Sequence, residues 1–193
     1  MIRIMKQGGD IESFINELSK RRLNQSPDIS KAVAQIIENI RSRGDEAVSE
    51  YTRKFDNIEL LPADFKVKNS QLENAYREID DNLLKIIKKS RQNIYDFHKK
   101  QKEKSWFEQD REGVLLGQKI TPLEKVGVYV PGGTAPLISS VLMNTVPAKV
   151  AGVSKVVMCT PPGEGGSVNP AMLVAAAEAG VDEIYTIGGA QAI

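Results

Sequence analysis

The chain has 193 residues, of which 41% are hydrophobic and 26% are charged, a balance typical of a globular protein with a sizeable core. Its formal net charge of +1 argues against a nucleic acid or an anionic membrane as partner. The chain has no apolar run of the roughly 18 residues that a transmembrane helix needs, and it has no signal-peptide pattern. Its one cysteine, Cys159, excludes an intrachain disulfide. We therefore expect a cytoplasmic protein.

Charged residues and glycines are distributed unequally along the chain. Residues 113–193 contain only 9 charged residues but 12 of the 15 glycines. We therefore expect a charged, helix-rich first part and a glycine-punctuated second part, with the boundary between about Glu112 and Lys125. In finer terms, the sequence predicts a helical segment over 1–25, a helix-rich α/β region over 26–124 and an α/β sheet over 125–193.

Helical spacing of apolar residues dominates the first part. The pattern i, i+3, i+4, i+7 occurs over 11–18, with Asp10 as a candidate N-cap, and again over 33–40, with Gly44 as the residue that ends the helix. Asp45 opens a third short helix that contains Val48, Tyr51 and Phe55.

Further along, Ser70-Gln-Leu-Glu73 fits a capping box before another helix. A long amphipathic helix is predicted from about Asn82 to Lys102, with an apolar side formed by Leu83, Ile86, Ile87, Ile94 and Phe97. Short strands are predicted over 65–67 and 113–120. The only histidine, His98, stands beside Phe97 without neighbours at metal-ligand spacing, so we assign it a structural or surface role.

The second part alternates between strand and helix patterns. Apolar strands are predicted over 126–130, 153–159 and 181–187, and helices over 137–150 and 170–179. Asn169 followed by Pro170 opens the second helix and Gly180 ends it. The order βαβαβ, with a further helix after Gly188-Gly189, predicts a parallel sheet because parallel strands need such crossovers.

Three glycine-rich loops follow the three strands: Pro131–Pro136, Thr160–Gly166 and Gly188–Gln191. Ligands of open α/β sheets bind at the carboxyl ends of the strands, and glycines allow the backbone to approach a ligand closely. The pattern is neither G-x-G-x-x-G nor a P-loop, and no acidic residue ends the second strand. A ligand-binding edge is therefore predicted, with contacts unlike those of a standard dinucleotide fingerprint.

The helix over 137–150 is apolar nearly all round, so we expect it to be buried between layers, with Pro147 kinking or shortening it. Ser139 and Ser140 near its start are expected to cap the helix, to pack, or to face the cleft. Cys159 has no histidine near it in sequence to activate it and is expected to be a small buried residue. No catalytic residue is assigned in this chain.

Longer motifs identify the chain as resembling a known family. The segments 126–144, 147–153, 159–162 and 188–193, together with 40–47 and 93–98, resemble histidinol dehydrogenase, over essentially the whole chain. The resemblance implies an NAD-dependent, zinc-containing homodimer with incomplete Rossmann-like domains. Such an enzyme oxidises L-histidinol through the aldehyde to L-histidine, the last steps of histidine biosynthesis.

The resemblance also implies residue roles. The family's two NAD-contacting residues that fall in this chain are Tyr129, in Tyr-Val-Pro-Gly-Gly, and Gln191, in Gly-Gly-Ala-Gln. Family members are more than twice as long, and their zinc ligands, their catalytic Glu-His pair and a third NAD contact lie beyond Ile193. No metal ligand is assigned in this chain. We therefore expect an N-terminal portion whose sheet of residues 125–193 is part of an NAD-binding domain, and which is inactive alone.

Two alternatives remain open from the residues. Another nicotinamide-dependent aldehyde or acyl-phosphate reductase would have a similar sheet but needs a catalytic cysteine, for which Cys159 is badly placed. A non-catalytic ligand-binding or assembly module would show no cofactor affinity even in a longer chain.

Overall fold

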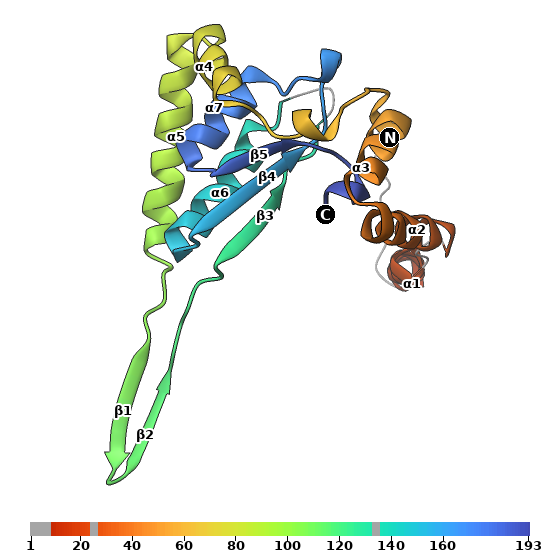
Figure 1. Ribbon diagram of the computed structural model, residues 1–193. Coiled ribbons are helices and arrows are strands. Elements are labelled where there is room, and N and C mark those ends of the chain that lie inside the picture. The colour runs from red at the N-terminus through yellow and green to blue at the C-terminus, as the bar shows by residue number, and fades with distance from the viewer. Residues whose placement is uncertain (1–8, 24–26, 133–135) are drawn as a thin grey trace.

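The computed structural model describes residues 9–23, 27–132 and 136–193 and combines a parallel sheet, a layer of helices and a projecting hairpin (Figure 1). The α-helices are α1 (Gly9–Leu23), α2 (Pro27–Arg43), α3 (Asp45–Asp56), α4 (Asn69–Glu78), α5 (Asp81–Lys99), α6 (Ile138–Ala151) and α7 (Pro170–Ala179). The strands are β1 (Trp106–Arg111), β2 (Val114–Gln118), β3 (Lys125–Tyr129), β4 (Lys155–Thr160) and β5 (Glu183–Thr186). Short 3₁₀ turns are η1 (Pro62–Asp64), η2 (Glu164–Gly166) and η3 (Ala190–Ala192). No described helix is both long and apolar enough to cross a membrane.

The predicted α/β class and the parallel βαβαβ order are confirmed. β3, β4 and β5 form a three-stranded sheet in that order, and both pairs are parallel. Val128 pairs with Met158, which pairs in turn with Ile184. Their side chains share one face of the sheet, because residues paired across neighbouring strands point to the same side. This apolar face is the one that the helices cover.

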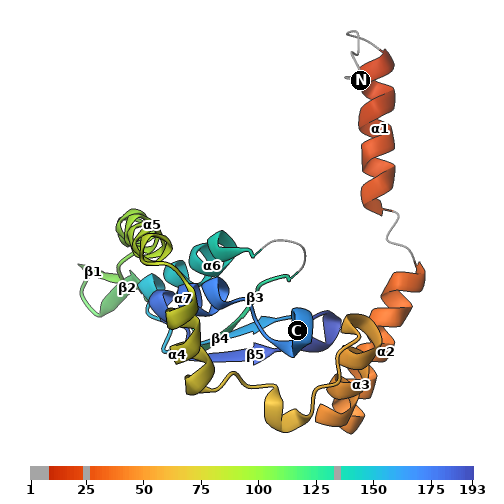
Figure 2. The same ribbon diagram turned by 90° about the horizontal axis from the view of Figure 1, so that it is seen from above.

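Helices α4 to α7 lie on one side of the sheet, whereas α2 and α3 lie away from them, near the end of the chain (Figure 2). α6 and α7 pack next to each other, and α5 packs on both. The core between them contains the fully buried Val130, Val156 and Met158. On the opposite face, Cys159 and Tyr185 are only half-buried. The sheet is therefore covered on one side within the described structure.

One expectation about α6 is wrong. Val141, Leu142 and Val146 are buried, but Met143 is 51% exposed, so α6 is not buried all round. The helix contacts β3, β4, α5 and α7 on one side and leaves the other side open. It also runs on past Pro147 to Ala151, so the proline does not shorten it.

Helices α4 and α5 belong to the same core as the sheet. Ala75 and Ile87 join the hydrophobic cluster that contains the strand residues. The Tyr76 hydroxyl donates to Glu178 Oε1 of α7 over 2.9 Å, and burial together with this hydrogen bond raises the pKa of Tyr76 to about 12. A polar contact thus reinforces the apolar packing between α4 and α7. The division at 25 and 124 stays a prediction.

The other N-terminal helices pack near the end of the chain. α2 and α3 form a helical pair whose buried Ile36 and Tyr51 contact Ala190 of η3. Gly44 joins them with φ 57°, a left-handed conformation that favours glycine, as predicted from its position. α1 begins at Gly9, so Asp10 lies inside the helix and its predicted role as N-cap is wrong.

Several helix ends agree with the sequence and one does not. The Asn169 side chain accepts the Ala171 N–H at 3.0 Å, and Gly180 ends α7 with φ 88°. The predicted capping box at Ser70–Glu73 is wrong, because α4 begins at Asn69 and its N-cap is Lys68, two residues before Ser70. The Lys68 N–H donates to Gln71 Oε1 over 2.7 Å, which is one half of a capping box, and a lysine side chain has no acceptor for the other half.

The hairpin of β1 and β2 corrects a further expectation. β2 lies within the predicted strand 113–120, but β1 was not predicted. The two strands pair antiparallel around Gly113, and every residue of both strands is exposed. In Figure 1 the hairpin extends away from the sheet beyond the end of α5.

The predicted apolar side of α5 is only partly correct. Leu83, Ile87 and Ile94 contact the core, whereas Ile86 is 52% and Phe97 is 61% exposed. The helix also ends at Lys99 rather than Lys102.

An antiparallel bridge replaces the strand expected over 65–67. Only Lys66 pairs with Tyr185, at the free edge of β5. Glu183 Oε1 accepts from Lys66 Nζ at 2.8 Å, and Glu183 Oε2 lies 3.0 Å from Lys155 Nζ. These hydrogen bonds, first from Lys66 and then from Lys155, lower the pKa of Glu183 to about 2.

A comparison of two neighbouring α6 residues tests the core. Leu142 is 2% exposed and Met143 is 51% exposed. We expect Leu142→Ala to lower the free energy of unfolding by about 2–5 kcal/mol, because it leaves a cavity. Met143→Ala should change it by about 0.5 kcal/mol or less. Urea unfolding measures both, and equal losses would contradict the packing described.

The charge cluster at Glu183 predicts acid sensitivity. Since its pKa is lowered from 4.5 to about 2, the stability from its ion pairs is complete above pH 4.5 and is lost as the pH falls toward 2. Glu183→Gln should flatten the decline in melting temperature over this range, as followed by circular dichroism. Glu112→Gln, at the hairpin turn, is the control and should leave the decline in melting temperature unchanged. If Glu183→Gln also leaves the decline unchanged, the ion pairs of Glu183 do not cause the acid sensitivity.

Candidate functional site

The carboxyl ends of the three parallel strands carry the predicted ligand-binding edge. Because β3, β4 and β5 are parallel, the segments that follow them emerge at the same end of the sheet. These segments begin with Pro131, Pro161 and Gly188. Residues 133–135, in the middle of the first predicted loop, lie outside the described residues.

A hydrogen bond joins the two outer segments. The Gly189 N–H donates to the Tyr129 hydroxyl over 3.1 Å, across 60 residues of sequence. Gly189 has φ 64°, which an L-residue rarely adopts. The Tyr129 ring is half-buried. The hydroxyl accepts this bond and keeps its own hydrogen to donate.

Gln191 lies two residues beyond this bond, in η3, and is 7% exposed. Neither its Oε1 nor its Nε2 has a hydrogen-bond partner within the described part of the chain. The amide packs against Gly189, where a Cβ would lie 2.6 Å from Oε1. A buried amide without partners costs about 1–3 kcal/mol, which a polar ligand group can recover.

The structure therefore brings the two sequence-predicted cofactor residues to one edge of the sheet. Tyr129 and Gln191 are linked through Gly189, and together they offer one hydroxyl donor, one amide donor group and one amide acceptor. Such neutral groups suit the amide, hydroxyl and ring-nitrogen atoms of a dinucleotide. They do not supply a charge for a phosphate.

A cleft of about 530 Å³ lies at the carboxyl ends of β3 and β4, and Gln191 is not among the residues that line it. Its wall includes Gly132 and Pro136 of the first segment, Thr160–Glu164 after β4, and the start of α7. Tyr129 does not line this cleft; it borders a shallower hollow along the free edge of β3, with Asn144 of α6. Ligand-sized space thus occurs at the carboxyl ends of β3 and β4 and along the free edge of β3, where Tyr129 borders it, but Gln191 borders neither hollow.

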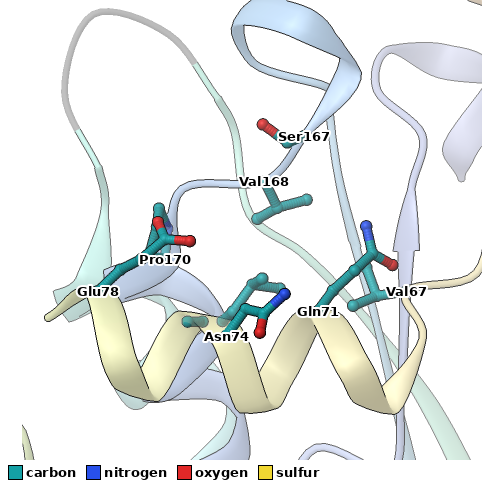
Figure 3. A pocket seen from close by; sticks show the side chains of 9 residues that line it. Val67, Gln71, Asn74, Glu78, Ser167, Val168 and Pro170 are labelled. Atoms are coloured by element: carbon teal, nitrogen blue, oxygen red, sulfur yellow. The ribbon is translucent and has the colours of Figure 1, made fainter.

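A second, smaller cavity lies between α4 and the segment before α7 (Figure 3). Its volume is about 200 Å³, and Gln71 and Asn74 point into it from α4, below Ser167 and Val168. Gln71 Oε1 already accepts the Lys68 N–H, and the Ser167 hydroxyl donates to the Glu164 carbonyl. Local hydrogen bonds occupy these groups, so we assign no ligand here.

Comparison with known proteins decides the family. Residues 19–193 match the family model described as histidinol dehydrogenase. The chain is 53% identical over 178 residues to a histidinol dehydrogenase of Heliobacterium mobile, covering 92% of this chain and 42% of the relative. It is 48% identical over 186 residues to one of Listeria innocua, covering 96% of this chain and 43% of the relative.

The chain belongs to the histidinol dehydrogenase family.

A solved structure supports this assignment at the level of the fold. The crystal structure of histidinol dehydrogenase from Elizabethkingia anophelis matches with a TM-score of 0.81 and 38% sequence identity, over 87% of this chain and 38% of that one. The chain spans about two fifths of the length of these histidinol dehydrogenases.

Two other chemically reactive side chains have no role in the predicted site, although Cys159 is the register partner of Tyr129 on β4. Cys159 is half-buried in the middle strand, and burial raises the pKa of its thiol, which disfavours the nucleophilic thiolate. His98 contacts the Phe97 ring edge-on with the centroids 5.3 Å apart, on α5. Among residues 9–23, 27–132 and 136–193, no three His, Cys, Asp or Glu side chains gather closely enough to hold a metal ion.

The serines of α6 do not take the expected capping role. The N-cap position is Leu137, and the described residues give it no side-chain hydrogen bond. Ser139 is exposed and Ser140 is half-buried, and neither borders the 530 Å³ cleft.

Sequence reasoning missed two residues that shape this edge of the sheet. The sequence predicts Gly189 only as part of a glycine-rich loop, whereas its N–H donates to the Tyr129 hydroxyl. The sequence predicts no role for Pro161, whereas a Cβ on Gly132 or on Gly188 would lie within 2.6 Å of its ring. The repeated glycines after the first and third strands were the available signal for both contacts.

Removal of the Tyr129 hydroxyl tests the link between the outer segments. Tyr129→Phe leaves the Gly189 N–H without its acceptor, so we expect its amide hydrogen to exchange about fivefold faster, the equivalent of about 1 kcal/mol. NMR-detected exchange in the 193-residue chain measures this. Tyr185→Phe removes a hydroxyl that lies 3.3 Å from Glu183 and should leave Gly189 unchanged. Equal exchange in wild type and Tyr129→Phe would refute the bond.

Proposed function

We propose that this chain is the N-terminal part of an NAD-dependent histidinol dehydrogenase, which oxidises L-histidinol through the aldehyde to L-histidine. The observation that carries the proposal is the pair formed by Tyr129 and Gln191 at the carboxyl edge of the parallel sheet, in a chain of this family. The reaction belongs to the last steps of histidine biosynthesis, and a cytoplasmic homodimer is part of the proposal.

The residues fit NAD as a ligand. The Gln191 amide is buried and unpaired within the described chain, so it gains hydrogen bonds when a cofactor amide or hydroxyl reaches it. The Tyr129 hydroxyl retains a donor, and its ring offers a flat surface to a nicotinamide or ribose. Bound NAD would supply the hydride acceptor; conversion of the alcohol to the carboxylate would need two NAD molecules in turn, one hydride to each, together with one water and the release of three protons. The residues of this chain bind and orient the cofactor.

Zinc belongs to the proposal only for the longer protein. The described residues contain no cluster that fits a metal ion, so no step is derived through zinc here. The zinc ligands and the acid–base residues are proposed to lie in the part of the relatives that this chain does not span. We accordingly propose that the 193-residue chain alone is inactive and that calorimetry will find weak or undetectable NAD binding. Micromolar affinity would contradict this part of the proposal.

A dehydrogenase assay tests the activity. A protein of the relatives' full length that carries this chain in place of the matching segment should form NADH from L-histidinol, measured by its absorbance. A zinc chelator should abolish NADH formation, and added zinc should restore it. Absence of NADH with zinc present, while the parent relative is active, would refute the proposed function.

Substitutions in the same full-length protein test the cofactor contacts. Gln191→Ala should raise the KM for NAD about tenfold, because one or two hydrogen bonds are lost. Gln118→Ala, on the exposed strand β2, is the matched control and should leave the KM unchanged. If both variants keep the wild-type KM for NAD, Gln191 is not a cofactor contact.

A further inference from the structure

Pro161 lies between two glycines that follow different strands. A Cβ placed on Gly132 would lie 2.6 Å from Pro161 Cγ, and one placed on Gly188 would lie 2.4 Å from Pro161 Cβ. Real Cβ atoms do not approach other atoms this closely. The proline ring therefore occupies the space on both sides that a side chain would need.

The backbone conformation does not explain these two glycines. Neither Gly132 nor Gly188 has a positive φ, whereas Gly189 does. An L-residue can adopt their backbone conformations, so their lack of a side chain is required by the contact with Pro161 and not by the turn. The contact with Pro161 therefore limits the distances between the three segments that contain Gly132, Pro161 and Gly188.

These three segments carry the proposed cofactor contacts. Pro161 directly follows Thr160, the last residue of the central strand, which is 1% exposed. Gly132 stands three residues after Tyr129, and Gly188 stands three residues before Gln191. A proline is suited to this place because its ring has a fixed φ and little freedom to move aside.

We propose that Pro161 is a positioning residue, whose ring sets the separation of the segments that hold Tyr129 and Gln191 and thereby the affinity of the site for its cofactor. The identity of that cofactor as NAD rests on the proposed function above; the spacing role does not. The Tyr129–Gly189 hydrogen bond joins the same two outer segments directly.

The positions of the Pro161 atoms predict that Pro161→Ala relieves the clash of one glycine variant and not that of the other. In Gly132→Ala the closest atom is Pro161 Cγ at 2.6 Å, while Pro161 Cβ lies at a harmless 3.5 Å. Pro161→Ala removes Cγ and should relieve this clash. In Gly188→Ala the closest atom is Pro161 Cβ at 2.4 Å, which an alanine retains. Only Pro161→Gly, which leaves Cα at 3.0 Å, should relieve that clash in part.

The rate of hydrogen exchange at the Gly189 amide reports on the separation of the two outer segments without any cofactor. In the 193-residue chain we expect Gly132→Ala and Gly188→Ala each to speed exchange of the Gly189 amide by about fivefold or more, because the outer segments are pushed apart. Adding Pro161→Ala should reverse the effect of Gly132→Ala but not that of Gly188→Ala. Pro162→Ala is the matched control, since Pro162 is not among the atoms nearest to either glycine in the described structure.

The KM for NAD of the full-length protein measures how the separation of these segments affects cofactor binding. Gly132→Ala should raise it about fivefold or more with a smaller effect on kcat, and Pro161→Ala should restore most of the loss. Where a variant is too unstable for the assay, its melting temperature relative to wild type is compared instead and should follow the same rescue pattern. Additive effects, or rescue of both glycine variants by Pro161→Ala, would overturn the proposal. Failure to form NADH refutes the proposed function instead, and the exchange pattern then still decides the role of Pro161.

Discussion

Parallel pairing of β3, β4 and β5 is the constraint on which the rest of the structure depends. Each parallel strand must be followed by a crossover before the next can pair with it, and here α6 and α7 provide those crossovers. All three strand ends therefore meet at one edge. Residues as far apart in sequence as Tyr129 and Gly189 come within hydrogen-bonding distance at that edge only because of this topology.

The hydrophobic core determines which face of the sheet the helices pack against. Val156 and Met158 point into a layer made by helices from both parts of the chain, and Ile87 of α5 joins the same cluster. A helix that precedes the sheet by many residues thus helps to hold the strands whose ends carry the site. The polar contact between Tyr76 and Glu178 lies at the outer edge of this layer, where it joins α4 to α7.

Local signals made much of this fold predictable. Asn169, Gly180 and Gly44 act through their own neighbouring backbone, so the ends of α7 and α2 follow from sequence. β1 was not predicted, because Glu-Gln-Asp-Arg after Trp106-Phe107 has no apolar alternation, and its pairing with β2 supplies what its composition lacks. The exposure of Ile86 and Phe97 was not predictable either, since periodicity defines a face of α5 but not which part of that face is covered.

The same distinction applies to the site. The strand-and-glycine pattern was enough to place three loops at one edge, and the resemblance supplied Tyr129 and Gln191. It could not show that the Gly189 N–H meets the Tyr129 hydroxyl, because that contact depends on strand register. The space filled by Pro161 between Gly132 and Gly188 is likewise a property of three adjacent strands and of no single segment.

The β1–β2 hairpin has a practical consequence for protein engineering. It leaves the core after α5 and returns to it at β3, and its strands bury no residue in the described structure. The turn at Gly113 is therefore a place where the chain can be lengthened without altering the sheet or its loops. A short peptide tag inserted there would allow the protein to be detected and would leave the edge of the sheet that carries Tyr129 and Gln191 unchanged.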